Sequence, residues 1–121
     1  MRAEIRKASE AREFTTVERC HIVEIANDDG DEQVSIARAR VEPGVTTAWH
    51  ALEGIGERYI VVAGRGRVEV GDSGPLEVAP GDVVRIPPGK PQRIANSGDE
   101  DLLFYAVCSP PFSAARYRNL E

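Results

Sequence analysis

Runs of Val, Ile and Thr alternate with clusters of Gly, Pro and Asp from residue 15 to residue 108. Short β-branched runs between such clusters are typical of the strands of a β-sandwich or β-barrel. The separating segments include NDDGDE, EPG, GDSGP, APGD, PPGKP and NSGDED, which are rich in turn-forming residues. The pattern predicts strands at residues 16–26, 34–42, 57–63, 66–70, 76–78, 83–86, 92–96 and 102–108.

Polar and apolar side chains alternate within these runs, as where Arg67 and Glu69 flank Val68. Such alternation indicates strands with one buried face, so the fold class is predicted to be all-β.

Residues 1–14 are charged and lack an apolar stripe, which indicates an arm, and residues 15–110 are predicted to form the barrel. Two prolines at positions 110 and 111 cannot continue a strand ladder, so residues 111–121 are predicted to be a tail or a short helix.

Composition narrows the possible partners. The 121 residues fit one domain, and the net charge of −5, from 15 basic and 20 acidic residues, argues against nucleic acid. No apolar run approaches the roughly 18 residues of a membrane-spanning helix, and the N-terminus has no apolar signal-peptide core. We therefore expect a cytoplasmic protein with no membrane partner. Cys20 and Cys108 form no CxxC pair and are expected to be buried thiols.

Two segments carry polar residues among glycines and prolines at fixed spacings. The first reads Gly44, five residues, His50, one residue, Leu52, four residues, Glu57, six residues, Gly64. The second reads Gly81, five residues, Pro87, one residue, Gly89, two residues, Gln92, three residues, Asn96. The glycines permit turns with positive φ, and the prolines end strands at a barrel edge.

Together these segments resemble the two motifs of the cupin family, G(X)5HXH(X)3-4E(X)6G and G(X)5PXG(X)2H(X)3N. The resemblance implies a small β-barrel of the double-stranded β-helix type, similar to a jelly roll. It also implies one divalent metal, which the histidines and the glutamate of the motifs hold inside the barrel, and a homodimer. Residues 1–14 and an exposed edge strand would be a natural place for the dimer contact.

Carried over residue by residue, the motifs make His50 and Glu57 metal ligands. Leu52 replaces the second histidine and cannot bind a metal, whereas Gln92 replaces the last histidine and offers a carbonyl oxygen. The resemblance therefore implies a reduced ligand set of His50, Glu57 and Gln92, with manganese, iron, nickel or zinc as candidate metals. The same three residues could equally form a hydrogen-bonded polar cluster without a metal. His21 either supplies a missing ligand or forms an ordinary hydrogen bond in a sheet, and the second is favoured.

If Glu57 and Gln92 point into the barrel, strand alternation places an apolar pocket around them. Its predicted lining is Leu52, Tyr59, Val61 and Ile94. Such a pocket suits a small molecule with one or two polar groups. A metal-dependent enzyme of the dioxygenase, isomerase or lyase type and a metal-free binding protein are the two leading hypotheses. A third is metal-free proton transfer by His50 and Tyr59, which resemblance to epimerases of this architecture implies.

Overall fold

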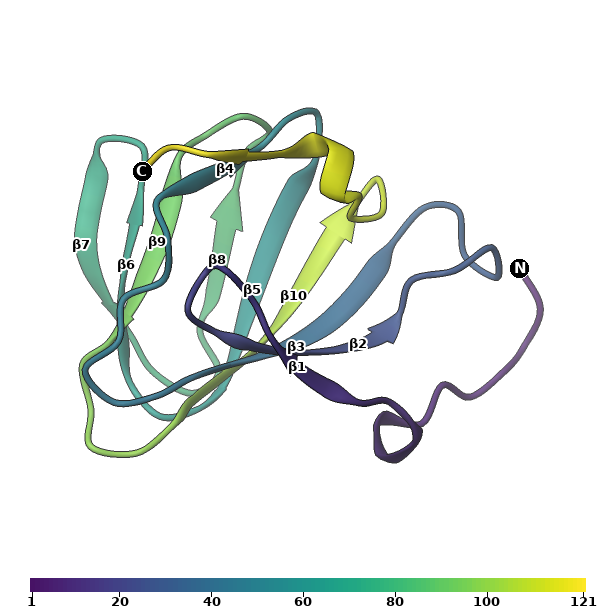
Figure 1. Cartoon of the computed structure of the whole chain (residues 1–121), viewed down its shortest axis with the longest axis horizontal. Helices are drawn as coiled ribbons and strands as arrows, with labels where there is room; N and C mark the ends of the chain where they lie inside the picture. Colours follow the sequence, from purple (N-terminus) through teal and green to yellow (C-terminus); the bar gives the residue numbers. More distant parts are fainter.

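The protein is built from two antiparallel sheets in the computed structural model, which describes residues 1–121 throughout (Figure 1). The six-stranded sheet has the order β1 (Glu13–Thr15), β2 (His21–Ala26), β3 (Ser35–Val41), β10 (Leu102–Ser109), β5 (Gly56–Ala63), β8 (Val83–Ile86). The five-stranded sheet has the order β11 (Tyr117–Asn119), β4 (His50–Leu52), β9 (Gln92–Asn96), β6 (Gly66–Val70), β7 (Ser73–Val78). The prediction of an all-β fold is therefore confirmed.

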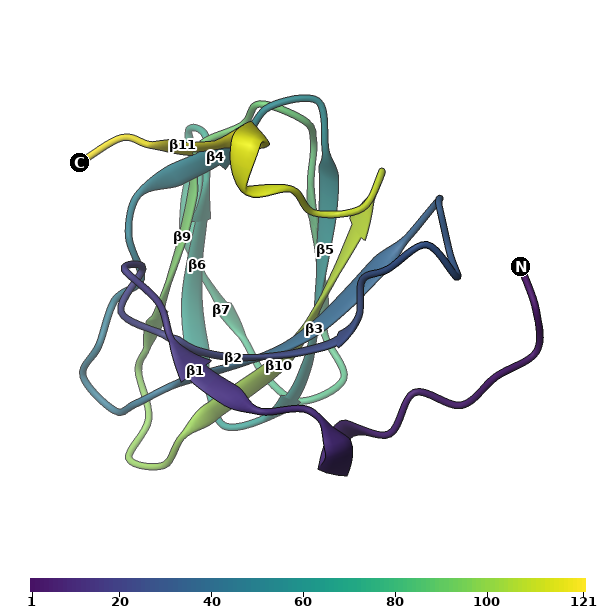
Figure 2. The ribbon, with the colours of Figure 1, turned by 45° about the vertical axis from the view of Figure 1, so that its right-hand side comes forward.

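The two sheets form opposite walls around one core (Figure 2). Val61 from the first sheet and Ile94 from the second are at most 2% exposed, and Leu102 is fully buried. Because alternate residues of each strand point inward, both sheets bury one face in the shared core.

Helical structure is confined to two 3-10 turns, Ala8–Glu10 and Ala114–Arg116. Neither turn has the length or the apolar character that a helix needs to cross a bilayer.

Each predicted strand has a counterpart, but three further strands were not predicted. These are β1, β4 and β11, each of three residues. The strand predicted from residue 16 begins only at His21, because residues 16–20 form a turn in which the Thr16 N–H donates to the Cys20 carbonyl and Arg19 has φ 69°.

The turn between β5 and β6 depends on Gly64. Its φ is 83°, and a Cβ at this position would lie 2.6 Å from the backbone oxygen of Asp101. A side chain is therefore excluded by both backbone conformation and space. This turn holds the start of β10 against β5 and so supports the barrel wall.

The last twelve residues, 110–121, cross one end of the barrel, and we call them the C-terminal segment. Its strand β11 pairs with β4, so that Tyr117 lies opposite Leu52 (Figure 2). The Leu120 N–H donates to the Trp49 carbonyl at 2.9 Å, and the Glu53 N–H donates to the Arg116 carbonyl at 2.8 Å. The segment is therefore part of the five-stranded sheet, whereas residues 1–12 lie outside the barrel, where Arg6 pairs with Asp28 of the β2–β3 connection at 2.6 Å (Figure 1).

Candidate functional site

A cluster of buried polar side chains lies inside the barrel at the end that the C-terminal segment crosses. His50 begins β4 and lies directly opposite Gln92, the first residue of β9. Glu57 comes from β5 and lies opposite Cys108 of β10. Glu18, from the turn before β2, completes the cluster. Both sheets therefore contribute to the site.

The imidazole of His50 and the carboxyl group of Glu18 face each other inside the barrel. The Nδ1 atom of His50 lies 2.7 Å from the Ala48 carbonyl oxygen, which can only accept, so Nδ1 carries a hydrogen. The Nε2 atom lies 3.2 Å from Oε2 of Glu18, a contact that is an ion pair when the imidazole is protonated. Burial raises the pKa of Glu18, and the nearby imidazole opposes that rise.

Glu57 forms a second hydrogen-bonded network. Its Oε1 accepts from the Gln92 amide nitrogen at 2.8 Å, and its Oε2 accepts from the Cys108 thiol at 3.5 Å. The Gln92 carbonyl accepts from the Tyr59 hydroxyl. Burial raises the pKa of Glu57, although Gln92 and His50 partly oppose the rise. The network therefore holds a carboxyl group that burial makes a weaker acid.

The cluster borders a small cavity of about 50 Å³. Its polar lining is Glu18, Thr47, His50, Glu57, Tyr59 and Tyr117. An adjoining hollow of about 130 Å³ leads outward between β2, β3 and β10 and shares Glu18, Ile22, Glu57, Ala106 and Phe112 with the cavity. Neither space is lined by a lysine or an arginine. The ionisable groups that border the cavity are therefore mainly two carboxyl groups and one imidazole, and this composition disfavours the binding of anions.

Tyr117 closes the cavity from the C-terminal segment. Its ring stacks on the His50 imidazole with centroids 5.2 Å apart and planes at 19°. Its hydroxyl is buried and has no hydrogen-bond partner, the only side-chain oxygen or nitrogen in this condition. Burial raises the pKa of Tyr117 to about 12, so the hydroxyl keeps its proton at neutral pH. A residue that lines the cavity therefore carries an unused hydrogen-bond donor.

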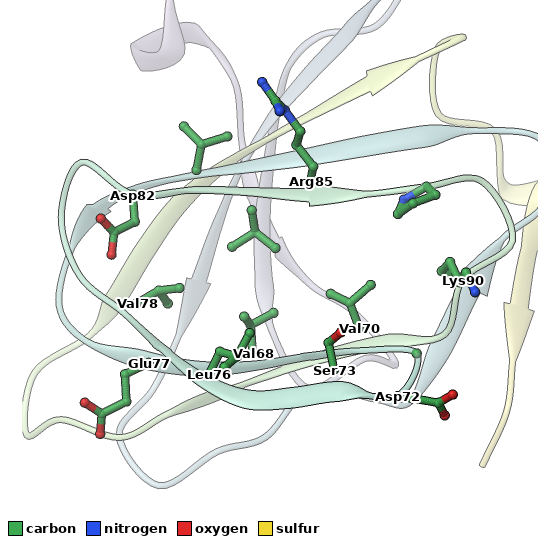
Figure 3. A pocket seen from close by; sticks show the side chains of 14 residues that line it. Val68, Val70, Asp72, Ser73, Leu76, Glu77, Val78, Asp82, Arg85 and Lys90 are labelled. Atoms are coloured by element: carbon green, nitrogen blue, oxygen red, sulfur yellow. The ribbon is translucent and has the colours of Figure 1, made fainter.

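A larger hollow of about 710 Å³ lies elsewhere, between the edge strands β7 and β8 (Figure 3). Valine side chains such as Val68 and Val70 line the inside of this hollow (Figure 3). Charged side chains such as Asp72, Glu77 and Arg85 lie around its edge and do not point toward one another (Figure 3). It has no group of converging polar side chains, which a specific small-molecule site requires. The cavity beside His50 is therefore the candidate site.

Comparison with known proteins places the fold in a family. The family model described as "Cupin domain" matches residues 37–108, more than half of the chain. The chain belongs to the cupin family. The resemblance that the two motifs carry is thereby confirmed.

One curated relative and two solved structures illustrate the similarity. The uncharacterised protein MJ1618 of Methanocaldococcus jannaschii is 35% identical over 79 residues, which are 65% of this chain and 62% of that protein's length. A variant of Streptomyces PAC13 solved with uridine has a TM-score of 0.83 at 17% identity and covers 100% of this chain and 93% of its own. Pac13 is described as a nucleoside dehydratase. KdgF from Halomonas sp. has a TM-score of 0.77 at 17% identity and covers 88% of this chain and 94% of its own. At such identities the two structures support the cupin fold alone.

The cupin motifs bring His50, Glu57 and Gln92 into one buried cluster, but the polar atoms of these side chains already contact other groups of the protein. Nε2 of His50 faces Glu18, and Gln92 turns its amide nitrogen, which has no lone pair for a metal, toward Glu57. No group of three or more His, Cys, Asp or Glu side chains is arranged to hold a metal ion. As arranged, these residues do not fit a metal, and we derive no chemistry through one.

The four residues predicted to line the pocket divide into two pairs. Leu52 and Tyr59 line the cavity. Val61 and Ile94 point inward as strand alternation predicted, but they lie two residues deeper along β5 and β9, where core side chains fill the barrel. His21 points away from the cavity and contacts Thr15 at 2.9 Å and Glu42 at 3.2 Å, the ordinary sheet partners that were favoured.

Sequence reasoning missed Glu18 and Tyr117. Glu18 could have been found, because it shares a face with Cys20 and Ile22 in the strand predicted over residues 16–26; all three line the cavity, although Glu18 itself lies in the turn before β2. Tyr117 follows two prolines and lies on a three-residue strand, which carries no periodic signal. It reaches the cavity only because β11 pairs with β4.

Proposed function

We propose that this cupin is a metal-independent enzyme that moves a proton on a small uncharged molecule bound in the barrel, as a lyase or an isomerase does. The observation that carries the proposal is the Glu18–His50 pair, whose Oε2 and Nε2 atoms lie 3.2 Å apart at the wall of a cavity. General acid–base catalysis needs a group that exchanges a proton near neutral pH, and burial raises the pKa of Glu18 in that direction.

The geometry suggests how such a reaction proceeds. Oε2 of Glu18 contacts His50, and Oε1 makes no hydrogen bond within the protein. As a carboxylate, Glu18 takes a proton from a carbon beside a carbonyl group, which leaves an enolate and a carboxylic acid. Return of that proton to another carbon gives an isomer, and its transfer to a departing hydroxide gives water and an unsaturated carbonyl compound. No oxidant or reductant is needed, and the fold likeness to a nucleoside dehydratase is compatible with this class of reaction.

The test is exchange of carbon-bound hydrogen with D₂O. Hydroxyaldehydes and hydroxyketones, among them sugars and nucleosides, are incubated with the protein and followed by proton NMR. We expect exchange in at least one compound and a loss of about 10²–10⁴-fold in Glu18→Gln. Glu42→Gln is the matched control, because Glu42 contacts His21 at the same 3.2 Å on the outer surface. Equal exchange rates in Glu18→Gln and the unmodified protein would refute the proposed role of the pair.

Metal analysis and hydrogen exchange on the same protein samples distinguish two other functions from the proposed one. A metal-dependent cupin with ligands His50, Glu57 and Gln92 would carry stoichiometric metal by elemental analysis of protein purified without a metal-affinity tag, and would lose it in Glu57→Ala. A metal-free binding protein would show neither metal nor hydrogen exchange.

A further inference from the structure

The Tyr117 hydroxyl is an exception among the buried polar atoms of this protein. Every other buried side-chain oxygen or nitrogen has a hydrogen-bond partner, but this hydroxyl has none. A buried hydroxyl without a partner costs folding free energy, so its presence calls for an explanation outside the folded chain itself. The hydroxyl belongs to a residue that lines the cavity beside His50 and Glu18.

The cavity is smaller than the molecules that enzymes usually bind. Small-molecule sites commonly have volumes of about 300–1,000 Å³, whereas this cavity has about 50 Å³ and the adjoining hollow about 130 Å³. Phe112 and Tyr117 of the C-terminal segment line the cavity, and Phe112 also lines the hollow. Displacement of this segment would therefore enlarge both spaces at once.

The C-terminal segment is held by the pairing of β11 with β4, by packing of Tyr117 against the buried Leu52 and Ile55, and by polar contacts near the protein surface. The Glu121 carboxylate accepts from both terminal nitrogens of Arg19, at 3.0 and 2.8 Å, and from the Trp49 N–H at 2.9 Å. Arg118 pairs with Glu53 at 2.5 Å. Exposed ion pairs of this kind contribute little stability each, so the segment is attached more weakly than the central strands.

We propose that the C-terminal segment is a movable wall of the active site, and that Tyr117 donates a hydrogen bond to a carbonyl or hydroxyl oxygen of an uncharged ligand. This deepens the proposed function and rests on it, because the same oxygen would carry the charge that develops when Glu18 removes a neighbouring proton. Anionic ligands are excluded because Glu18 and Glu57 border the cavity without a lysine or an arginine.

Acetamide and acetate test the ligand class, because they have nearly the same shape and differ in charge. We expect acetamide at millimolar concentrations to shift the NMR signals of Tyr117 and His50, and acetate to leave them unchanged at pH 7. Tyr117→Phe keeps the ring and removes the hydroxyl, so acetamide should bind about tenfold more weakly to this variant. Equal binding to Tyr117→Phe, no acetamide binding, or equal binding of acetate would overturn the proposal.

Thermal unfolding without ligand is a second test of the hydroxyl. Removal of an unpartnered buried donor should leave the melting temperature of Tyr117→Phe unchanged or raised. A clear fall would show that the hydroxyl has a structural partner and would overturn its role as a free donor.

Hydrogen exchange tests the movable wall. Glu121→Gln weakens the contact with Arg19, so the Leu120 and Glu53 amides, which join the segment to the barrel, should exchange about two- to fivefold faster. Glu69→Gln is the control, since it breaks a similar two-point pair with Arg93 on other strands. Unchanged exchange in Glu121→Gln would overturn the movable wall. These outcomes are independent of the D₂O experiment, so failure of the proposed reaction and failure of this inference are distinguishable.

Discussion

The two buried carboxyl groups of the barrel, those of Glu18 and Glu57, have different neighbours and are therefore suited to different chemistry. Glu18 has the His50 imidazole as a partner, with 3.2 Å between its Oε2 and Nε2 of His50. Glu57 has an amide and a thiol, which donate hydrogen bonds but hold no comparable charge. Burial raises the pKa of both groups. Glu18 is therefore suited to exchange a proton with a ligand, whereas Glu57 organises the cavity wall.

The pH dependence of stability should reveal the buried Glu57 carboxyl. Burial raises the pKa of Glu57 in the folded state above the ordinary value of 4.5, so the folded protein holds this proton more tightly than the unfolded chain does. Stability is consequently lost as pH rises from about 4.5 toward the folded-state pKa. In Glu57→Gln we expect a shallower decline of the unfolding free energy over this range, measured by urea denaturation at successive pH values. Glu18 is unchanged in both proteins, and identical pH profiles would contradict the prediction.

Substitution of the core residue Ile94 should lower the unfolding free energy of the protein. Its side chain is fully buried between the sheets, so Ile94→Ala leaves a cavity. We expect a loss of about 2–5 kcal/mol in the unfolding free energy, measured by urea denaturation. Val62→Ala, at a position 47% exposed, should change it by less than about 0.5 kcal/mol. Equal losses in the two variants would mean that the core is not packed as described.

At the level of elements, the long strands were predictable and the short ones were not. β5, β6 and β8 follow runs rich in Val and Ile, and β9 and β10 follow segments in which more and less buried side chains largely alternate. β4 and β11 have three residues each, too few to show a period of two. They exist because their backbone groups pair with each other, Tyr117 with Leu52 and Asn119 with His50. This pairing joins residues far apart in the chain, which no local pattern reveals.

The attachment of the C-terminal segment should weaken in acid. Arg19, together with the Trp49 N–H, lowers the pKa of Glu121 from 4.5 to about 2, and the charge of Arg93 contributes in the same direction. A carboxyl group with a lowered pKa stabilises the folded state above its unfolded pKa, and that contribution is lost as pH falls through the folded one. After correction for the intrinsic pH dependence of exchange, we expect the Leu120 amide to lose protection between about pH 4.5 and pH 2. Glu121→Gln should lack this transition, and a matching transition in that variant would assign it to another group.

For the whole molecule, the motifs located the site but not its chemistry. They predicted that His50, Glu57 and Gln92 would gather in a barrel, and the three side chains do lie in one buried cluster. Glu18 and Tyr117 lie outside both motifs and enter the site through a turn before β2 and through the C-terminal segment. The Glu18–His50 pair and the free Tyr117 hydroxyl depend on atomic distances that the spacing of residues in the sequence does not provide.

We also predict that the protein forms a homodimer and that its N-terminal arm, residues 1–12, makes the contact between the two copies. Met1 and Ile5 are 92% and 83% exposed, so the arm buries almost no apolar surface within its own chain. Ordering a chain segment costs conformational entropy that only new contacts offset. Since resemblance to cupins implies a homodimer, we expect a second copy of the chain to provide those contacts. Light scattering should give about twice the chain mass of 13.2 kDa, and removal of residues 1–12 should lower it to one chain mass with unchanged circular dichroism. A single chain mass for the full-length protein would exclude the dimer, and a dimer that persists without the arm would place the contact on the barrel itself.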